Sequence, residues 1–233
     1  MYSELEINDS IIHSIKNVDL IWEHIYNSKK KLQFYWLGKH SFNKIWELQK
    51  ALHLKRVNGE IFNVVLMLEH EHVYTFGKNA DKNYLLNNSF DNMDIVDIDR
   101  GGEVTYHGPG QLVCYPIIDL HDYKMSISWY MRSLEEIIIS YLQKVGINAV
   151  RKEKLTGVWV DNEKICAMGV RLAKWVTMHG FALNVNPNLS YFDKIIPCGI
   201  FEYGITSMHE LGLSINTKVA AESIVDHFKG CFN

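Results

Sequence analysis

The residue run best suited to chemistry is a glycine-rich loop at residues 100–111, which reads RGGEVTYHGPGQ. Glycine has no Cβ, so such a chain can adopt positive φ and bring its N–H groups against a ligand. Pro109 lies between two glycines and restricts the turn, because proline fixes its own φ and disfavours helix at the residue before it. The loop is therefore expected to have a restricted conformation and still to allow a ligand close to its backbone.

Two known kinds of nucleotide loop have a different spacing. The segment lacks the Gly-Lys-Ser/Thr ending of a phosphate loop, and no helix is expected to begin inside its glycines as the dinucleotide fingerprint requires. A glycine- and proline-rich hairpin between two strands would show the same composition. On this loop alone, ligand binding and a simple turn remain equally open.

Four segments read together resemble the lipoyl(octanoyl)transferase family. Residues 100–120 are similar to the family's signature, and residues 69–77, 157–171 and 175–199 are similar to its further segments, in the same order. The resemblance spans most of the chain from about residue 32. It implies an α+β fold of the biotin/lipoate protein ligase type, with a mixed β-sheet and packed helices, and the transfer of octanoyl groups to lipoyl domains.

The resemblance also implies roles for particular residues. In that family the cysteine of a Pro-Cys-Gly element carries the acyl chain as a thioester, and a lysine lowers its pKa; these positions match Cys198 and Lys164. The substrate-contacting segments match Arg100, Gly101, Gly102, Glu103, Val104, Thr105, Tyr106 and His107, then Ala167, Met168 and Gly169, then Gly180, Phe181 and Ala182. The chain departs from the family pattern at Cys166, where small apolar residues are usual, and at residues 71–72, where prolines are common.

The implied reaction partners are octanoyl-acyl carrier protein as donor, and as acceptors the lipoyl domains of 2-oxoacid dehydrogenase subunits and the glycine cleavage H protein. No cofactor and no metal ion are implied. Three alternatives stay open: an ATP-dependent lipoate or biotin ligase of the same fold, an amidotransferase that moves octanoyl between lipoyl domains, and a catalytically silent module that binds lipoyl domains.

The chemistry of acyl transfer explains why a cysteine and a lysine would be needed together. A free thiol has a pKa of about 8.5 and is mostly protonated near neutrality, so a nearby ammonium group must favour the thiolate. The same amine, once neutral, can accept a proton from the incoming lysine, whose free pKa is about 10.4. Without the resemblance, a lone cysteine such as Cys198 is usually a small buried hydrophobe, and the spacing around Lys164 favours a lysine in a surface turn.

Small residues in the matched segments would leave an apolar slot for the acyl chain, with Tyr106 and Phe181 as possible walls. His107 and His179 could bond the substrate carbonyl or simply shape their loops. Because Cys166 is two residues from Lys164, a regular strand would place both side chains on one face. A packing role is nevertheless expected for the three cysteines other than the proposed nucleophile.

Composition limits the class of protein. A chain of 233 residues with 47% hydrophobic residues can bury one full core, and a net charge of −3 gives no sign of a nucleic-acid-binding field. No apolar run approaches eighteen residues, and charges near the start argue against a signal peptide, which indicates a cytoplasmic protein. The four cysteines form no C-x-x-C pair, and His70 with His72 lacks a third ligand, so a metal site is not expected. A monomer is expected.

Hydrophobic periodicity predicts helices over residues 41–57, 128–145 and 217–229. Strands are predicted over residues 61–68, 94–98, 111–119, 147–152, 156–160, 164–172 and 175–185. Residues 1–31 are interpreted as an N-terminal extension with a helix that packs on the body, and residues 32–233 as the catalytic domain. Helices before, between and after the strands favour an α+β domain.

Overall fold

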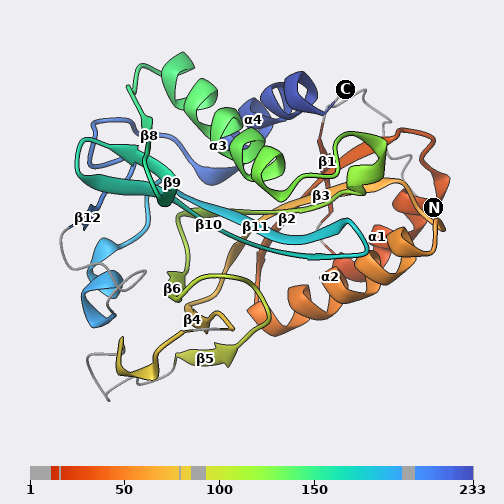
Figure 1. Cartoon of the computed structure of the whole chain (residues 1–233), viewed down its shortest axis with the longest axis horizontal. Helices are drawn as coiled ribbons and strands as arrows, with labels where there is room; N and C mark the ends of the chain where they lie inside the picture. The colour runs from red at the N-terminus through yellow and green to blue at the C-terminus, as the bar shows by residue number, and fades with distance from the viewer. Residues whose placement is uncertain (1–11, 16, 79, 85–92, 196–202, 233) are drawn as a thin grey trace, which may run out of the picture.

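The structure, a computed structural model, describes residues 12–15, 17–78, 80–84, 93–195 and 203–232. Its main feature is a nine-stranded mixed sheet, in which the described strands lie in the order β1-β2-β3-β7-β11-β10-β9-β8 and β12 pairs with β10 (Figure 1). A second sheet of three strands has the order β5-β4-β6 and lies below the main sheet in that view. The predicted mixed sheet with packed helices is confirmed.

The main sheet contains both parallel and antiparallel pairs of strands. β1 pairs parallel with β2 and β2 with β3, whereas β3-β7, β7-β11, β11-β10, β10-β9 and β9-β8 are antiparallel. Their bounds are β1 His13–Ser14, β2 Leu32–His40, β3 Asn63–His70, β7 Gln111–Ile117, β8 Val150–Lys152, β9 Leu155–Val160, β10 Glu163–Ala173, β11 Val176–Asn184 and β12 Gly204–Ile205. The small sheet comprises β4 Val73–Phe76, β5 Asp94–Asp97 and β6 Val104–His107.

Helices cover both faces of the main sheet. α3 (Ile127–Lys144) and α4 (Thr217–Cys231) lie on one face, and α1 (Ile21–Asn27) and α2 (Phe42–Val57) lie on the other (Figure 1). The alternation along β3 divides its side chains between the two cores, because successive residues of a strand point to opposite faces. Val65 packs in the core with α3 and α4, and Val64 in the core with α1 and α2. Short 3-10 helices occupy Val18–Leu20, Lys82–Tyr84, Leu120–Asp122 and Leu189–Lys194.

The predicted helices are confirmed, with ends one or two residues from the expected ones. Ser126 precedes α3, and its hydroxyl accepts a hydrogen bond from the Trp129 N–H at 3.2 Å, so this helix begins one residue before its predicted start. Gly146 ends it with a φ of +88°, a conformation that side-chain-bearing residues rarely adopt. Ser41 precedes α2 as predicted, but its side chain makes no capping bond.

Strands β2, β4 and β6 were not predicted. β4 and β6 have only four residues each, and all four residues of β4 are buried, so a run this short gives little periodicity to detect. Of the N-terminal extension, β1 adds a parallel strand to the edge of the main sheet, and Ile21 and Ile25 of α1 join the core beneath α2. The domain boundary at residue 31 stays a prediction.

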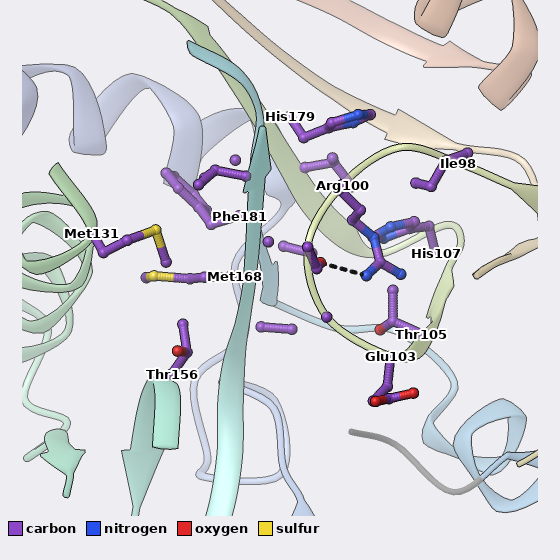
Figure 2. Close-up of a pocket in the computed structure, with 18 of the residues that line it drawn as sticks. Ile98, Arg100, Glu103, Thr105, His107, Met131, Thr156, Met168, His179 and Phe181 are labelled. Carbon is purple, nitrogen blue, oxygen red and sulfur yellow. Dashed lines mark hydrogen bonds between the residues drawn. The ribbon is translucent and has the colours of Figure 1, made fainter. Parts of the chain in front are cut away.

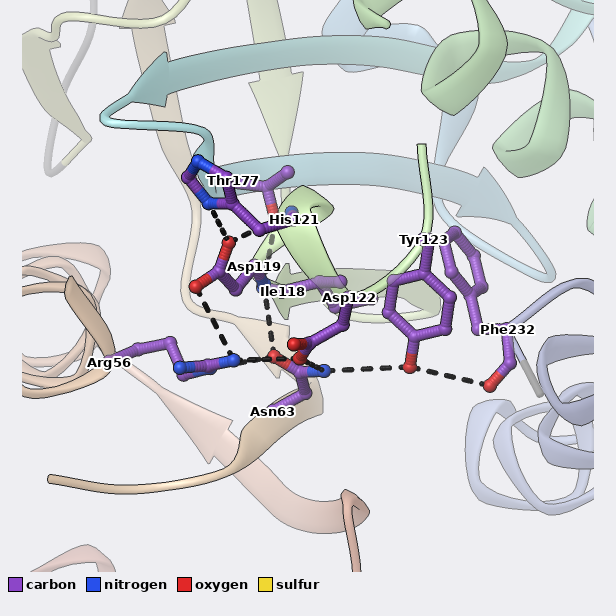
Figure 3. Close-up of polar contacts among 9 residues, drawn as sticks. All are labelled: Arg56, Asn63, Ile118, Asp119, His121, Asp122, Tyr123, Thr177 and Phe232. Atoms are coloured by element: carbon purple, nitrogen blue, oxygen red, sulfur yellow. Dashed lines mark hydrogen bonds and ion pairs between the residues drawn. The ribbon is translucent and has the colours of Figure 1, made fainter. Parts of the chain in front are cut away.

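A buried asparagine joins three segments at the end of the sheet opposite the small sheet (Figure 3). The Asn63 side-chain oxygen accepts hydrogen bonds from Arg56 Nε at 2.8 Å and from the Asp119 N–H at 2.9 Å. Its amide nitrogen donates to Asp122 Oδ2 at 3.1 Å and to the Tyr123 hydroxyl at 3.4 Å. One side chain with 1% exposure therefore ties the end of α2 to the turn that follows β7.

Replacement of Asn63 by alanine is expected to lower the free energy of unfolding by about 2–4 kcal/mol, because it leaves a buried N–H without its acceptor. Urea denaturation followed by circular dichroism measures the change. His121→Ala is the matched control, since His121 contacts the same turn through Asp119 but its side chain is 54% exposed. Equal losses in both variants would refute a central role for Asn63.

Candidate active site

A cavity of about 380 Å³ lies between the main sheet and the small sheet. Figure 2 shows part of its lining, with β10 and β11 crossing the middle of the view. The lining residues come from five parts of the fold: α2, the loop before β6 with β6 and β7, α3, the start of β9, and the β10-β11 hairpin. They are Phe42, Ile98, Arg100, Gly101, Gly102, Glu103, Val104, Thr105, His107, Val113, Tyr115, Met131, Lys154, Leu155, Thr156, Lys164, Ala167, Met168, Gly169, Val170, His179, Gly180, Phe181 and Ala182.

The loop at the mouth of this cavity is fixed by Arg100, which is 7% exposed. Its guanidinium donates to the Thr75 carbonyl at 2.8 Å, to the Thr75 hydroxyl at 3.0 Å and to the Gly101 carbonyl at 3.0 Å. The Gly101 N–H donates to the Val170 carbonyl at 3.1 Å. These bonds fasten the loop to β4 of the small sheet and to β10 of the main sheet.

Asp99, the residue before Arg100, attaches the loop to the main sheet a second time. One carboxylate oxygen accepts from His179 Nε2 at 2.9 Å and the other pairs with Arg171 at 2.8 Å. The hydrogen bond from His179, followed by the Arg171 charge, holds the pKa of Asp99 below its usual value. Burial lowers the pKa of His179 despite that bond, so the imidazole is neutral near pH 7.

The backbone of β11 is distorted at His179. His179 has a φ of +60°, and the register places it opposite Pro116 of β7, which has no N–H to donate. The His179 N–H instead donates to the side-chain oxygen of Gln49 in α2 at 3.0 Å. In a regular strand His179 and Phe181 would share a face, but Phe181 packs toward α3 while His179 bonds Asp99 beside the small sheet.

A bulge in β10 determines on which side of the strand the Lys164 side chain lies. The register with β9 shifts between Lys164 and Cys166, and the side chains of Ile165 and Cys166 both lie in the core under α3 and α4. Two consecutive residues on one face are possible only because of the bulge. The expectation that Cys166 and Lys164 share a face is therefore wrong: Lys164 lines the cavity and Cys166 does not.

Lys164 is 6% exposed, and its surroundings restrict the position of its ammonium group. A side chain at Gly157 would collide with the Cys166 carbonyl oxygen at 2.6 Å, and the Lys164 stem lies beside the same position, with Cε at contact distance, 3.5 Å. The Lys164 nitrogen lies 4.8 Å from the centre of the Trp159 ring, a cation–π distance. Lys152 lies 5.4 Å from the same ring and 4.3 Å from that of Tyr203, so the ring holds two cations near the site.

His107 begins a chain of buried hydrogen bonds that runs behind the cavity. Its Nδ1 donates to Gln111 at 2.7 Å, Gln111 donates to Asn184 at 2.9 Å, and Asn184 donates to the Thr206 carbonyl at 2.9 Å. The Thr206 N–H donates in turn to the Lys164 carbonyl at 3.1 Å. Complete burial, followed by the charge of His70, lowers the pKa of His107 to about 3. This imidazole is neutral and fixed in position.

The structure brings together most of the predicted substrate-binding residues. The members that line the cavity are Arg100, Gly101, Gly102, Glu103, Val104, Thr105, His107, Ala167, Met168, Gly169, Gly180, Phe181 and Ala182. Tyr106 is an exception, and its expected role as a wall of the slot is wrong. Its ring points away into the core of the small sheet, where it stacks on Tyr191 with a centroid distance of 4.9 Å.

Cys198 lies outside the described residues. The described chain before it ends at Ile195, which is 3% exposed and packs with Phe192 in the small-sheet core. After it, the chain returns at β12, where Gly204 pairs with Glu163 and Ile205 with Lys164. The described residues that follow Cys198 therefore run beside the strand that carries Lys164.

Neither a metal centre nor a membrane span is found in the described part of the chain. No three side chains of the metal-binding types gather there, and no helix there is both long and apolar enough to cross a bilayer. His70 and His72 are occupied inside the fold. His70 accepts from the Tyr115 hydroxyl at 2.7 Å, and His72 Nδ1 lies 2.8 Å from the Tyr106 hydroxyl.

Sequence reasoning did not identify several residues that shape the site: Gln49, Asp99, Met131, Arg171 and the lining residue Tyr115. Asp99 directly precedes the glycine-rich loop, and its charge beside Arg100 was a detectable signal. Gln49 bonds His179, which is 130 residues away in the sequence, and Met131 lines the cavity from α3, outside every matched segment. Only the packing of α2 and α3 against the sheet identifies them.

The buried histidines predict how stability depends on pH. Burial lowers the pKa of His107 to about 3, whereas an unfolded histidine has a pKa of about 6.5. Below pH 6.5 the unfolded chain therefore binds a proton that the native state excludes, so His107 destabilises the fold as pH falls from 6.5 toward 3. His107→Gln is expected to reduce the dependence of unfolding free energy on pH, by up to about 1.4 kcal/mol per pH unit between pH 6 and 4.

Urea unfolding of both proteins at half-unit pH steps measures this difference. His209→Gln is the control, because His209 is exposed and lies outside the cavity lining. Parallel pH profiles for His107→Gln and the unaltered protein would show that His107 is charged in the native state.

Comparison with known proteins adds family membership to this geometry. The family model described as the lipoyl protein ligase A/B catalytic domain matches residues 42–229. A protein named octanoyltransferase from Solibacter usitatus (strain Ellin6076) is 45% identical over 205 residues, which cover 84% of this chain and 91% of the relative.

Solved structures agree on the fold. A bi-partite lipoate protein ligase from Thermoplasma acidophilum superposes with a TM-score of 0.60 at 14% identity, over 79% of both chains. A biotin protein ligase from Aquifex aeolicus gives 0.53 at 14% identity, over 84% of this chain and 68% of that one. The cavity is thus built on the fold shared by lipoate and biotin protein ligases, and the chain belongs to the lipoyl protein ligase A/B catalytic domain family.

Proposed function

We propose that this protein transfers an octanoyl group from octanoyl-acyl carrier protein to a specific lysine of lipoyl domains, through a thioester on Cys198. The observation that carries the proposal is the buried Lys164 side chain, which opens into an apolar cavity lined by the glycine-rich loop and the β10-β11 hairpin. The relatives that share over 40% of their residues with this chain are named octanoyltransferases, so the chain is an acyltransferase.

In the first half-reaction, the Cys198 thiolate attacks the carbonyl carbon of the donor thioester, and the donor's sulfur leaves as a thiolate that takes a proton from the Lys164 ammonium, so Lys164 is neutral for the second step. One thioester replaces another of similar energy, so the exchange needs no ATP. The Lys164 ammonium would favour the thiolate by Coulomb attraction. This role is supported by the strand β12, which follows Cys198 in sequence and pairs directly with Lys164.

In the second half-reaction, the amine of the acceptor lysine attacks the Cys198 thioester, and the cysteine leaves as a thiolate. An amine with a free pKa of about 10.4 arrives protonated and must lose a proton before it can attack. Lys164 is the proposed base. His107 and His179 are held neutral by burial, and each is engaged by a partner, Gln111 or Asp99, which fits positioning better than proton transfer.

The acyl chain is proposed to lie on the face of the main sheet that is turned to the small sheet. Gly169 and Ala182 provide space there, and Phe42 and Val113 supply apolar walls. A side chain at Gly169 would come within 2.8 Å of the Gly101 carbonyl, so only glycine allows the loop to approach the strand this closely. A volume of about 380 Å³ is within the usual range for a small-ligand pocket, roughly 300–1,000 Å³.

The same proposal includes the acceptor proteins, the oligomeric state and the cellular location of the enzyme. The acceptors are lipoyl domains of 2-oxoacid dehydrogenase subunits and of the glycine cleavage H protein, the enzyme acts as a monomer in the cytoplasm, and no cofactor takes part. An ATP-dependent ligase of this fold is the main alternative. It would need ATP before any acyl transfer and would not require Cys198.

Cys198→Ala is expected to abolish formation of an acyl-enzyme. When the purified protein is mixed with octanoyl-acyl carrier protein without ATP, intact-protein mass spectrometry should detect one octanoyl adduct, released by hydroxylamine as thioesters are. Cys231→Ala is the matched control, since Cys231 is half-buried in α4 and outside the cavity lining, and it should form the adduct normally. An adduct that survives in Cys198→Ala, or that forms only with ATP, would overturn the mechanism.

Lys164→Ala is expected to slow thioester formation at pH 7 by about a hundredfold, because the cysteine then lacks the cation that favours its thiolate. The loss should shrink as pH rises past about 8.5, where a free thiol ionises without help. Rapid-quench rates of adduct formation between pH 6.5 and 9.5 test this. Lys218→Ala, which removes an exposed lysine of α4 outside the cavity lining, should leave the pH profile unchanged. A Lys164→Ala profile parallel to that of the unaltered protein would exclude the role in thiol activation.

A further inference from the structure

The cavity continues around a gap in the pairing of β10. In the described residues, pairing of β10 with β9 stops at Cys166, opposite Val158, and the next partner along that edge is Gly101, whose N–H bonds the Val170 carbonyl. Main-chain groups of a strand point to alternate sides, so Met168, two residues before Val170, directs its N–H and C=O to the same edge. Met168 therefore presents one donor and one acceptor at an edge that no described strand covers.

Beyond this edge, the cavity has a second part on the α3 side of the sheet. Figure 2 shows Met131, Met168, Thr156 and Phe181 on one side of the strand, and Arg100, His107 and Thr105 on the other. Phe181 and Met168 pack with the core under α3 and α4, which places them on the sheet face opposite the glycine-rich loop. We name the part lined by Met131, Thr156, Met168 and Phe181 the α3-side channel.

The walls of the α3-side channel suit a thin, flexible chain. Met131 and Met168 are unbranched and adapt to different shapes, and both are only partly buried. Lys154 stands at the outer rim with its side chain 89% exposed, and its contact with Glu153, at 3.9 Å and equally exposed, is a weak surface pair. From rim to interior, the channel offers a cation, then apolar walls, then a main-chain amide at an edge that no described strand covers.

We propose that the α3-side channel receives the phosphopantetheine arm of the thioester donor. This inference rests on the proposed function, in which the donor is an acyl carrier protein. The arm has a phosphate at its outer end, followed by amide groups separated by short methylene segments, and it ends in the thioester. From rim to interior, the phosphate would meet the cation of Lys154, the methylene segments would meet the methionine walls, and an amide group would meet the main chain of Met168. The acyl chain would then cross the edge of β10 to the side of the glycine-rich loop.

Two donors distinguish an arm channel from other uses of this space. Octanoyl-acyl carrier protein carries the full arm, whereas S-octanoyl-2-mercaptoethanol carries the same acyl chain on a thiol without phosphate or amides. Met131→Trp would fill the channel from α3, and Thr156→Trp would fill it from an exposed position on β9, where folding tolerates a large side chain. Both should raise the KM for octanoyl-acyl carrier protein at least about tenfold.

The same variants should change kcat/KM for the short donor less than about twofold and leave the KM of the lipoyl-domain acceptor unchanged. Met125→Trp is the matched control, because Met125 is 56% exposed and outside the cavity lining. It should change the kinetic constants for neither donor. Equal losses with both donors would place the acyl chain in the channel. A raised acceptor KM alone would place the acceptor lysine there, and unchanged kinetics would leave the channel without a role; each overturns the proposal.

Failure of the proposed function would look different. The unaltered protein would then transfer octanoyl from neither donor in the absence of ATP, before any variant is compared. Transfer by the unaltered protein together with no donor selectivity in Met131→Trp and Thr156→Trp would reject the arm channel alone.

Discussion

The site depends on how one short segment, residues 98–102, is fastened between two sheets. Arg100 bonds Thr75 in the small sheet, and Gly101 bonds Val170 in the main sheet. Removing a guanidinium from water is costly unless oxygen acceptors replace its hydration, and the Thr75 and Gly101 oxygens supply such acceptors here. With the bonds of Asp99 to His179 and Arg171, these attachments hold the loop at its present distance from β10.

The buried charge of Arg100 also determines the protonation of the groups around it. It lowers the pKa of His107 and of His179, after burial has already lowered both. The imidazoles behind the cavity are therefore neutral, and the cations that face it are Arg100, Lys164 and, at the rim, Lys154. A fixed positive potential in a partly closed cavity stabilises an anionic thiolate or a tetrahedral oxyanion without a proton having to move. Both steps of the proposed acyl transfer need such stabilisation.

The sequence predicted most of the fold because the long elements have strong periodicity. Helices α2, α3 and α4 and the long strands β10 and β11 were all anticipated close to their observed bounds. The errors concern irregular backbone. The bulge between Lys164 and Cys166 reverses which of them faces the cavity, and Tyr106 turns away because β6 belongs to a small sheet with its own core. Neither a bulge nor a second sheet leaves a signal in hydrophobic spacing, since both depend on which strands become partners.

Irregular pairing, in turn, explains how one sheet can serve a reaction with two large substrates. A fully paired sheet separates its two faces, so a cavity on one face could be approached only from that face. In β10 the pairing is interrupted around Met168, and the lining residues of a single cavity lie on both faces of the strand. In the proposed reaction, a long donor would reach the reacting carbon from one face while its acyl chain is held on the other. The interruption requires small residues beside it, because any side chain at Gly169 would collide with the loop that limits the gap.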